Sequence, residues 1–207
     1  LGDVYKRQEY TEVEVCGNIE ADVFMDCEVT CKGYLVMKGK RAKIMGGHIY
    51  AAYGIDANDI GNVAEVSTYV AVGVGNKEDA KLAALQKQLK ENQDTLDKME
   101  RALKQFDLAE KEKGVSYKND PRRMQLLRER IKYIATINAD KATAWELQQL
   151  IENAKHATVK ANHNVYPGVL VKIGDLVTNV KVQQGNLEFV KRVDHIVMSP
   201  LDEKVVI

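Results

Sequence analysis

The sequence predicts a β protein with an α-helical insertion, namely a parallel β-helix interrupted by a long antiparallel two-helix coiled coil. Three observations carry this prediction. Short branched-aliphatic stretches punctuated by Gly, Asn and Asp fill both ends of the 207-residue chain. A charged segment with a leucine every three or four residues separates them. The change from strand period to helix period falls inside "VAVGVGNKEDAKLAALQKQL", residues 70–89.

The β-helix prediction depends on a small unit that recurs in both flanks. It reads "IEADV" (19–23), "IYAAYGI" (49–55), "IDANDI" (55–60) and "VKANHNV" (159–165). Each copy places a branched aliphatic residue and an alanine two positions apart, hence on one face of a strand. Asn or Asp follows in three copies and tolerates the left-handed backbone of a tight corner. Stacked rungs fit this pattern, and a β-sandwich is the alternative, although the Asn-Gly and Asp-Gly hairpin turns typical of it are absent.

The central segment contains two runs with the three-four spacing of a heptad repeat. Gly114 stops the first run, and Asp120-Pro121 is a helix start signal for the second. The first seam is Leu82, Leu85, Leu89, Asn92, Leu96, Met99, Leu103 and Phe106. The second seam is Met124, Leu127, Ile131, Ile134, Asn138, Lys141, Trp145 and Gln148.

Folding the two runs back about residue 115 sets every position of one seam opposite a position of the other. Asn92 then faces Asn138, which predicts a buried asparagine pair that fixes the register. Two unrelated surface asparagines are the alternative. A second apolar stripe near the base, formed by Ile137, Ala144, Leu147 and Ile151, predicts that the packing face rotates there.

An antiparallel pair of helices returns the chain to the place where it left, so it can interrupt a β-helix without disturbing the stacked rungs. The predicted coiled-coil insertion is residues 77–155, and residues 9–76 with 156–207 form the discontinuous β-helix base. The opening "LGDVYKRQ", residues 1–8, resembles the translated adapter remnants at the ends of assembled environmental genes. These eight residues are therefore predicted to be a non-native leader.

Composition narrows the function classes. The 30 basic and 30 acidic residues cancel, so no net field draws the chain to nucleic acid or to an anionic membrane. No apolar run approaches the length needed to cross a bilayer. Cys16, Cys27 and Cys31 are predicted to be small core residues rather than a disulfide framework or metal ligands. The expected compartment is the cytoplasm.

The known catalytic and cofactor motifs are missing. "VGVGNKED" begins like a dinucleotide-binding loop, but the third glycine position holds Glu78, where the loop requires close packing against a pyrophosphate. No GxSxG, HExxH or Walker A sequence occurs. The four histidines are scattered. The sequence therefore predicts a protein that is not an enzyme and has no cofactor, no catalytic residues and no metal site.

A family resemblance adds to this. The stretch "KIMGGHIYAAYGIDANDIGNVAEVSTYVAVGV" (43–74), followed by a helical hairpin and then "VYPGVLVKIG" (165–174), resembles the flagellar assembly protein A family over about residues 15–200. The resemblance implies a right-handed β-helix with an inserted coiled coil, and a part in flagellar assembly or its regulation. An RNA-binding role has also been suggested for the family. The resemblance implies no catalytic residues.

The leading hypothesis is a scaffold or protein-interaction module that acts through the turn between its helices. "KEKGVSYKNDPRR" (111–123) combines a tyrosine with a ring of cations, so Tyr117, Arg122 and Arg123 are the predicted partner-binding residues. A solvated turn is the alternative. The alternative function is RNA binding by the basic start of the second helix, "PRRMQLLRERIK" (121–132). The expected partner is a protein, with no nucleic acid and no membrane, and a homo-oligomer is compatible with the sequence.

Overall fold

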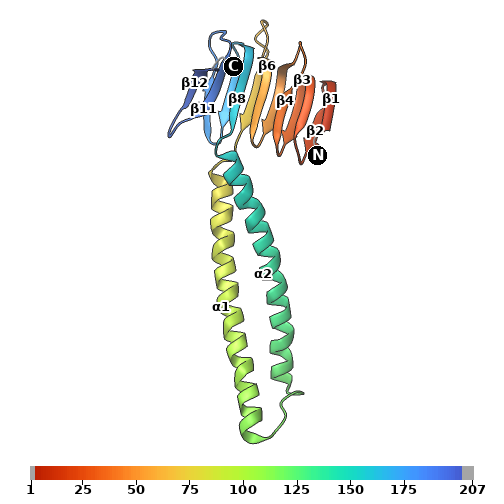
Figure 1. Cartoon of the computed structure of the whole chain (residues 1–207), viewed down its shortest axis with the longest axis vertical. Helices are drawn as coiled ribbons and strands as arrows, with labels where there is room; N and C mark the ends of the chain where they lie inside the picture. The colour runs from red at the N-terminus through yellow and green to blue at the C-terminus, as the bar shows by residue number, and fades with distance from the viewer. Residues whose placement is uncertain (1–2, 202–207) are drawn as a thin grey trace, which may run out of the picture. The chain divides into compact units, whose positions relative to one another are not determined.

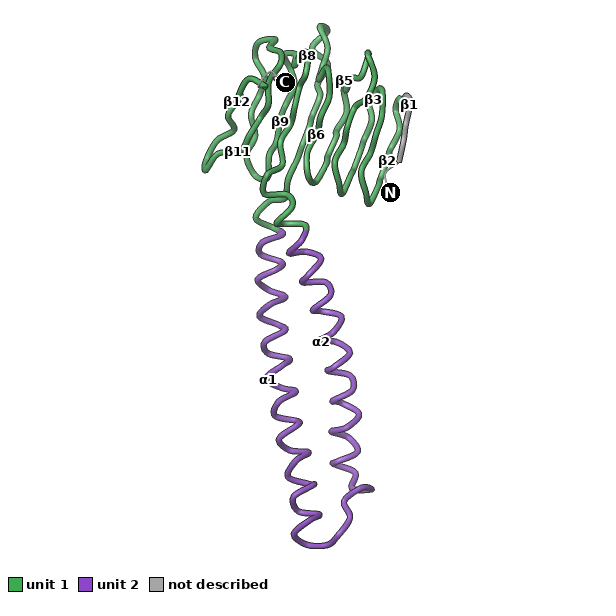
Figure 2. Tube along the Cα trace, in the orientation of Figure 1, with its two compact units in different colours: residues 1–77, 150–207 green, residues 78–149 purple. Residues whose placement is uncertain are grey.

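The computed structural model describes residues 3–201. It divides into two compact units (Figure 2), the first made of Leu1–Lys77 with Leu150–Ile207 and the second of Glu78–Gln149. The second unit begins one residue after the start of the predicted insertion and ends before its predicted end at 155, because the last turn of the second helix groups with the strands.

Twelve strands and two helices follow one another along the chain (Figure 1). Seven strands precede the helices: β1 (Asp3–Glu9), β2 (Glu12–Val15), β3 (Ile19–Cys31), β4 (Tyr34–Met37), β5 (Lys43–Ala51), β6 (Gly54–Ile60) and β7 (Thr68–Val72). The helices are α1 (Asn76–Lys113) and α2 (Pro121–Ala154). Five strands follow: β8 (Thr158–Val165), β9 (Val169–Ile173), β10 (Leu176–Asn179), β11 (Leu187–Lys191) and β12 (Ile196–Pro200).

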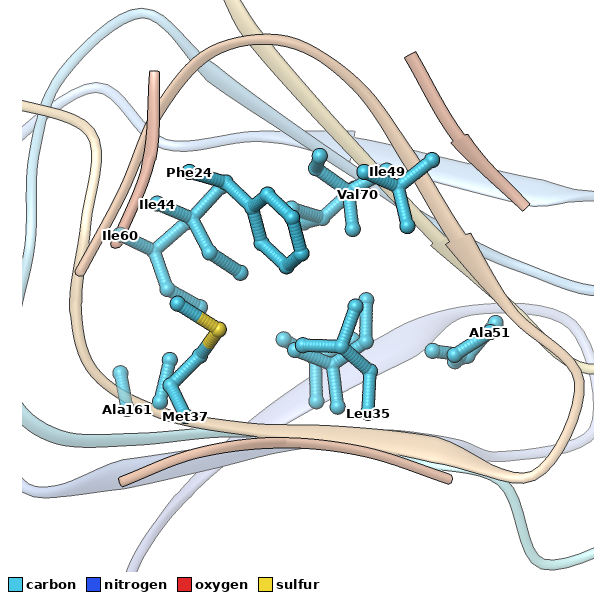
Figure 3. Close-up of a cluster of buried hydrophobic side chains, with 14 of the residues drawn as sticks. Phe24, Leu35, Met37, Ile44, Ile49, Ala51, Ile60, Val70 and Ala161 are labelled. Carbon is cyan, nitrogen blue, oxygen red and sulfur yellow. The ribbon is translucent and has the colours of Figure 1, made fainter. Parts of the chain in front are cut away.

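The strands coil into a β-solenoid of about three turns with mostly parallel pairing, which confirms the predicted fold class of stacked rungs with two inserted helices. One face stacks the start of β3, β4, β6 and β8. A second face stacks the middle of β3 on the start of β5, and the start of β5 on the end of β6. The third stacks the end of β3, the end of β5, β7 and β9. The chain thus encloses a core on three sides (Figure 3).

Columns of like residues fill this core, because parallel pairing in register sets equivalent residues of successive turns directly over one another. Phe24 pairs with Ile44, Ile44 with Ile60 and Ile60 with Val165, and all four side chains are fully buried. Figure 3 shows the first three lying along one wall of the core. Two further columns are Val29, Ile49, Val70 and Val171, and Ile19, Leu35, Ile55 and Val159.

The "MGGH" sequence forms a corner between two faces. Gly46 and Gly47 both have positive φ, of 70° and 73°, and Asp26 occupies the equivalent corner of the turn before with a φ of 51°. A Cβ at Gly47 would overlap the carbonyl oxygen of Cys27 on the neighbouring strand, so the corner requires glycine there. The buried Thr68 hydroxyl accepts a hydrogen bond from the Gly46 N–H at 2.8 Å and donates to the Val66 carbonyl at 2.9 Å.

The strands after the helices continue the stack that the first seven began. β8 pairs in parallel with β6, setting Val159 beside Ile55, and β9 pairs in parallel with β7, setting Val171 beside Val70. β10, β11 and β12 then pair antiparallel at the end of the stack. The helical segment is therefore an insertion between neighbouring rungs of one solenoid.

The predicted leader, residues 1–8, overlaps β1, and residues 1–2 lie outside the described part of the chain. The backbone of β1 pairs in parallel with β3, from Asp3 beside Ile19 to Glu9 beside Met25. Backbone pairing does not reveal whether a segment is native, so the non-native origin of residues 1–8 stays a prediction.

The helical unit is a hairpin with little buried surface. Contacts between its helices join Gln88 to Asp140 at 3.3 Å, and two Arg–carboxylate ion pairs, described below, lie farther toward the turn. Positions on α2 fall as those on α1 rise, so the helices run in opposite directions. Of the hydrophobic side chains in residues 78–149, all of which the structure describes, only Leu96 and Ile137 are buried. Neither helix has an apolar stretch long enough to cross a membrane.

Candidate interaction site

The turn between the helices is held by local backbone contacts at both ends. Gly114 has a φ of 63° and its N–H donates to the Glu110 carbonyl at 3.0 Å, which ends α1 in the manner of a left-handed cap. The Asp120 carboxylate accepts from the backbone N–H groups of Arg122, at 2.8 Å, and Arg123, at 3.3 Å. Asp120 is thus the N-cap of α2, as the Asp-Pro signal predicts.

Two of the three predicted partner-binding residues make contacts within the hairpin. The ring of Tyr117 is half-buried and meets that of Phe106 edge to face, with 6.1 Å between ring centroids. The Arg123 guanidinium forms an ion pair with Asp107 at 3.1 Å, and its side chain is only 21% exposed. Its Nε is buried with no hydrogen-bond partner among the described residues. Both side chains therefore anchor the turn to α1.

Other charged and apolar side chains of the turn are exposed to solvent and form one surface. Arg122, the third predicted residue, is exposed, and Val115 is 54% exposed although it is apolar. We define the tip surface as Lys111, Lys113, Val115, Lys118 and Arg122, all of which are exposed. Glu112 is the exposed acidic residue of the same segment, so the tip surface is strongly cationic.

The contact between Asp107 and Arg123 was missed from the sequence, although its signal is present there. The two residues have opposite charge and lie at equal distances from residue 115, about which the helices fold back. Glu100 and Arg130 have the same relation and form an ion pair at 3.3 Å. Symmetry about the turn thus identifies both pairs.

The structure does not place the predicted register residues together in a buried layer. Asn92 is half-buried and Asn138 is exposed, whereas Ile137, next to Asn138, is 3% exposed. The axial register agrees with the predicted one, since Glu100 lies opposite Arg130 and Asp107 opposite Arg123. α2 is instead rotated about its axis, so that the stripe containing Ile137 faces α1 and the stripe containing Asn138 faces outward.

The surface of the solenoid has a hollow of about 340 Å³, and several of its lining side chains contact one another or a neighbour. Tyr34 and Tyr53 meet edge to face at 5.6 Å, and Lys160 forms an ion pair with Glu188 at 3.6 Å. Asp56, which also lines the hollow, accepts a hydrogen bond from the amide of Asn162 at 2.7 Å. Among the described residues that line this hollow, no buried side-chain nitrogen or oxygen lacks a hydrogen-bond partner.

The titratable groups with shifted pKa values do not form a reactive cluster. Burial raises the pKa of the Cys31 thiol, and the hydrogen bond from His195 lowers the pKa of the exposed Asp194 carboxyl. Cys27 is buried like Cys31, which confirms that these two are core residues, whereas Cys16 is exposed. Within residues 8–201, whose side chains the structure describes, no three His, Cys, Asp or Glu side chains lie close enough together to hold a metal ion.

Comparison with known families gives one result. The model of the Flagellar Assembly Protein A beta solenoid domain matches residues 4–196, which include the solenoid on both sides of the helices and the helices themselves. No curated protein and no solved structure matches the chain. The match covers most of the chain and agrees with the observed solenoid, and the family domain indicates a function related to flagellar assembly. The chain therefore belongs to the flagellar assembly protein A family.

Proposed function

We propose that the protein is a non-enzymatic scaffold that acts in the cytoplasm during flagellar assembly or its regulation and binds a protein partner through its tip surface. The observation that carries this proposal is the exposure of Val115 among four exposed cations at the turn of the hairpin. An isolated apolar side chain at a charged turn contributes nothing to the fold, but it gains free energy when a partner covers it.

The chemistry of the tip surface defines the partner. Four cations favour binding to an acidic protein surface, and long-range attraction between opposite charges accelerates association. The apolar contact requires that the partner also offers a small hydrophobic depression beside its carboxylates, into which Val115 fits. The expected partner is therefore a protein whose binding surface is acidic with an apolar centre.

Tyr117 and Arg123 support this surface rather than form it. The Phe106–Tyr117 ring contact and the Asp107–Arg123 ion pair both tie the turn to the end of α1. An ordered turn loses less conformational entropy on binding than a free one, so these contacts favour recognition. Variants of Tyr117 or Arg123 would perturb the hairpin as well as the surface and are unsuitable as binding tests.

RNA binding remains the alternative proposal, and the arginine contacts count against it. Two arginines of the basic segment 121–132, Arg123 and Arg130, are already paired with Asp107 and Glu100 of α1. A phosphate backbone would have to displace these carboxylates. RNA binding predicts an affinity that falls steeply with salt, and a gel-shift titration at two salt concentrations separates the two proposals.

The test is complementation in a flagellated bacterium from which the family member has been deleted. The tip variant combines Val115→Ala, Lys118→Glu and Arg122→Glu, which alter three exposed side chains of the tip surface. The matched control combines two charge reversals of the same type away from the tip, Lys90→Glu and Lys132→Glu, at exposed helix positions.

The expected result is that wild type and control restore motility and flagellar number, whereas the tip variant does not, at equal protein level and equal helical circular dichroism. Photo-crosslinking from position 115 should then capture the same acidic protein with wild type and control only. Normal flagellation with the tip variant would show that the tip surface is not the functional one.

A further inference from the structure

The second helix has an apolar stripe that the hairpin leaves in solvent. Met124, Ile131 and Trp145 are 40%, 67% and 64% exposed, large values for side chains of this kind. Ile131 follows Met124 by one heptad, and Trp145 follows Ile131 by two, with Asn138 at the heptad position between them. All four therefore lie on one side of α2.

Small and charged residues complete this stripe. Arg128, Ala135 and Ala142 lie four residues after Met124, Ile131 and Asn138, and all three are exposed. The resulting steps of four and three residues are those of a coiled-coil seam. We define the outer seam as Met124, Arg128, Ile131, Ala135, Asn138, Ala142 and Trp145.

The hairpin buries little hydrophobic surface of its own. Leu96 and Ile137 are its two buried hydrophobic side chains in residues 78–149, and the other leucines and isoleucines of its inner face stay partly exposed. Helices without extensive packing are marginal in water, since most helix stability in proteins comes from tertiary contacts. Two hairpins that join side by side would form a four-helix arrangement, which is a common way to cover such faces.

We propose that the outer seam binds the outer seam of a second copy of this chain, with the two α2 helices antiparallel. One register matches large side chains to small ones: Ile131 lies against the partner's Ala142, and Asn138 lies against the partner's Ala135. The two-fold axis repeats each contact, so every match occurs twice. This alternation of large and small side chains is what lets two helices interdigitate closely.

The same register places Arg128 against the partner's Trp145. A guanidinium over an indole ring is a favourable cation–π contact, worth about 0.5–1 kcal/mol when exposed. Asn138 and the partner's Asn138 then lie about 5 Å apart along the axis, three residues at 1.5 Å each, within reach of a hydrogen bond between their amides. A polar pair of this kind fixes the register of a helix pair.

A parallel arrangement fits the outer seam less well. It would set Arg128 against the partner's Arg128, which brings like charges together, and Ala135 against the partner's Ala135, which leaves a gap. The antiparallel arrangement has neither defect. Charge and volume thus both select the antiparallel dimer.

The size of the outer seam sets the expected affinity. From Met124 to Gln149 the helix face is about 37 Å long and about 12 Å wide, or about 450 Å² on each chain. The pair buries about 900 Å², slightly less than the about 1,000 Å² of a stable specific interface. The dimer is therefore weak and dissociates on dilution, with a dissociation constant in the micromolar range.

Sedimentation and tryptophan emission of the full chain over a hundredfold range of concentration test this proposal. Trp145 is the single tryptophan, so its emission reports on the outer seam alone. With increasing concentration, a monomer-to-dimer transition and a blue shift of the emission should follow the same curve. Ile131→Glu should weaken association about a hundredfold, because the dimer would bury an unpaired carboxylate on each chain. Thr136→Glu, an exposed position off the seam, should leave it unchanged.

Disulfide crosslinking tests the orientation. In a Cys16→Ser background, which removes the exposed native thiol, Ile131→Cys and Ala142→Cys are made as separate chains. Oxidation of the mixture should give a linked heterodimer, whereas either variant alone should stay unlinked, since its two thiols lie about 16 Å apart along the axis. Linkage of Ile131→Cys to itself would overturn the antiparallel arrangement. A monomer at every concentration, or equal loss of association in Ile131→Glu and Thr136→Glu, would overturn the dimer.

Discussion

The column of Phe24, Ile44, Ile60 and Val165 makes a quantitative prediction about what holds the solenoid together. Ile44 lies between Phe24 of the turn before and Ile60 of the turn after, and it is fully buried. Ile44→Ala removes three carbon atoms, which costs about 2.4 kcal/mol in lost burial at about 0.8 kcal/mol per carbon.

The void left by this substitution adds to the cost. Pairing with β3 on one side and with β6 on the other fixes the backbone of β5 at Ile44, so the neighbouring turns cannot close the gap. The expected total is about 4 kcal/mol, inside the range of about 2–5 kcal/mol for buried Ile→Ala changes. Ile44→Val removes one carbon atom and should cost about 1 kcal/mol.

The assay must report on the solenoid separately from the hairpin. Trp145 lies in the hairpin and the helices dominate the far-ultraviolet circular dichroism, so native-state hydrogen exchange of the β5 amides is the suitable measurement. Exchange should become about a thousandfold faster in Ile44→Ala. Val63→Ala, at an 83% exposed position of the same unit, should change it little. Equal effects of the two alanine variants would refute the column as a source of stability.

Three further predictions concern the corner, the thiols and the insertion. Gly114→Ala should cost about 1 kcal/mol of backbone strain, because nothing lies within 4 Å of a Cβ there, whereas Gly47→Ala at a similar φ should prevent the solenoid from folding, as soluble yield will show. Iodoacetamide should alkylate Cys16 in the native protein and Cys31 only in urea, because burial covers the Cys31 thiol and raises its pKa; mass mapping checks this. A chain in which a short Gly/Ser linker replaces residues 78–149 should keep protected strand amides, and rapid exchange throughout would contradict the insertion.

The sequence predicted the solenoid because its signal is local and repeated. In "IEADV" (19–23) the apolar positions Ile19 and Ala21 are both buried in the structure, and the same alternation buries Ile55 and Ala57 in "IDANDI". The period of a strand and the tight polar corners are properties of a few neighbouring residues. The family resemblance, also read from these stretches, is confirmed by the match over residues 4–196.

The sequence predicted a rotation of the packing face of α2 only near the base, and its extent was less predictable because two apolar stripes compete on one helix. Met124, Ile131 and Trp145 form one stripe, and Ile137, Ala144 and Leu147 form the other. Heptad spacing describes both equally well, and only contacts between the helices choose the one that faces α1. The structure buries Ile137 and leaves Ile131 and Trp145 in solvent. The axial register, in contrast, was predictable from the turn alone.

A helix with two apolar stripes has more hydrophobic surface than one partner helix can cover. In an isolated hairpin this excess is a cost, because exposed isoleucine and tryptophan favour non-specific association. It becomes useful when a second helix of matched shape covers it, and the outer seam carries its own match in the alternation of Ile131, Ala135, Asn138 and Ala142. The outer seam, which the expected packing would have set against α1, is therefore the surface that specifies a partner. The buried columns of the solenoid leave no hydrophobic surface exposed, so they specify only the fold.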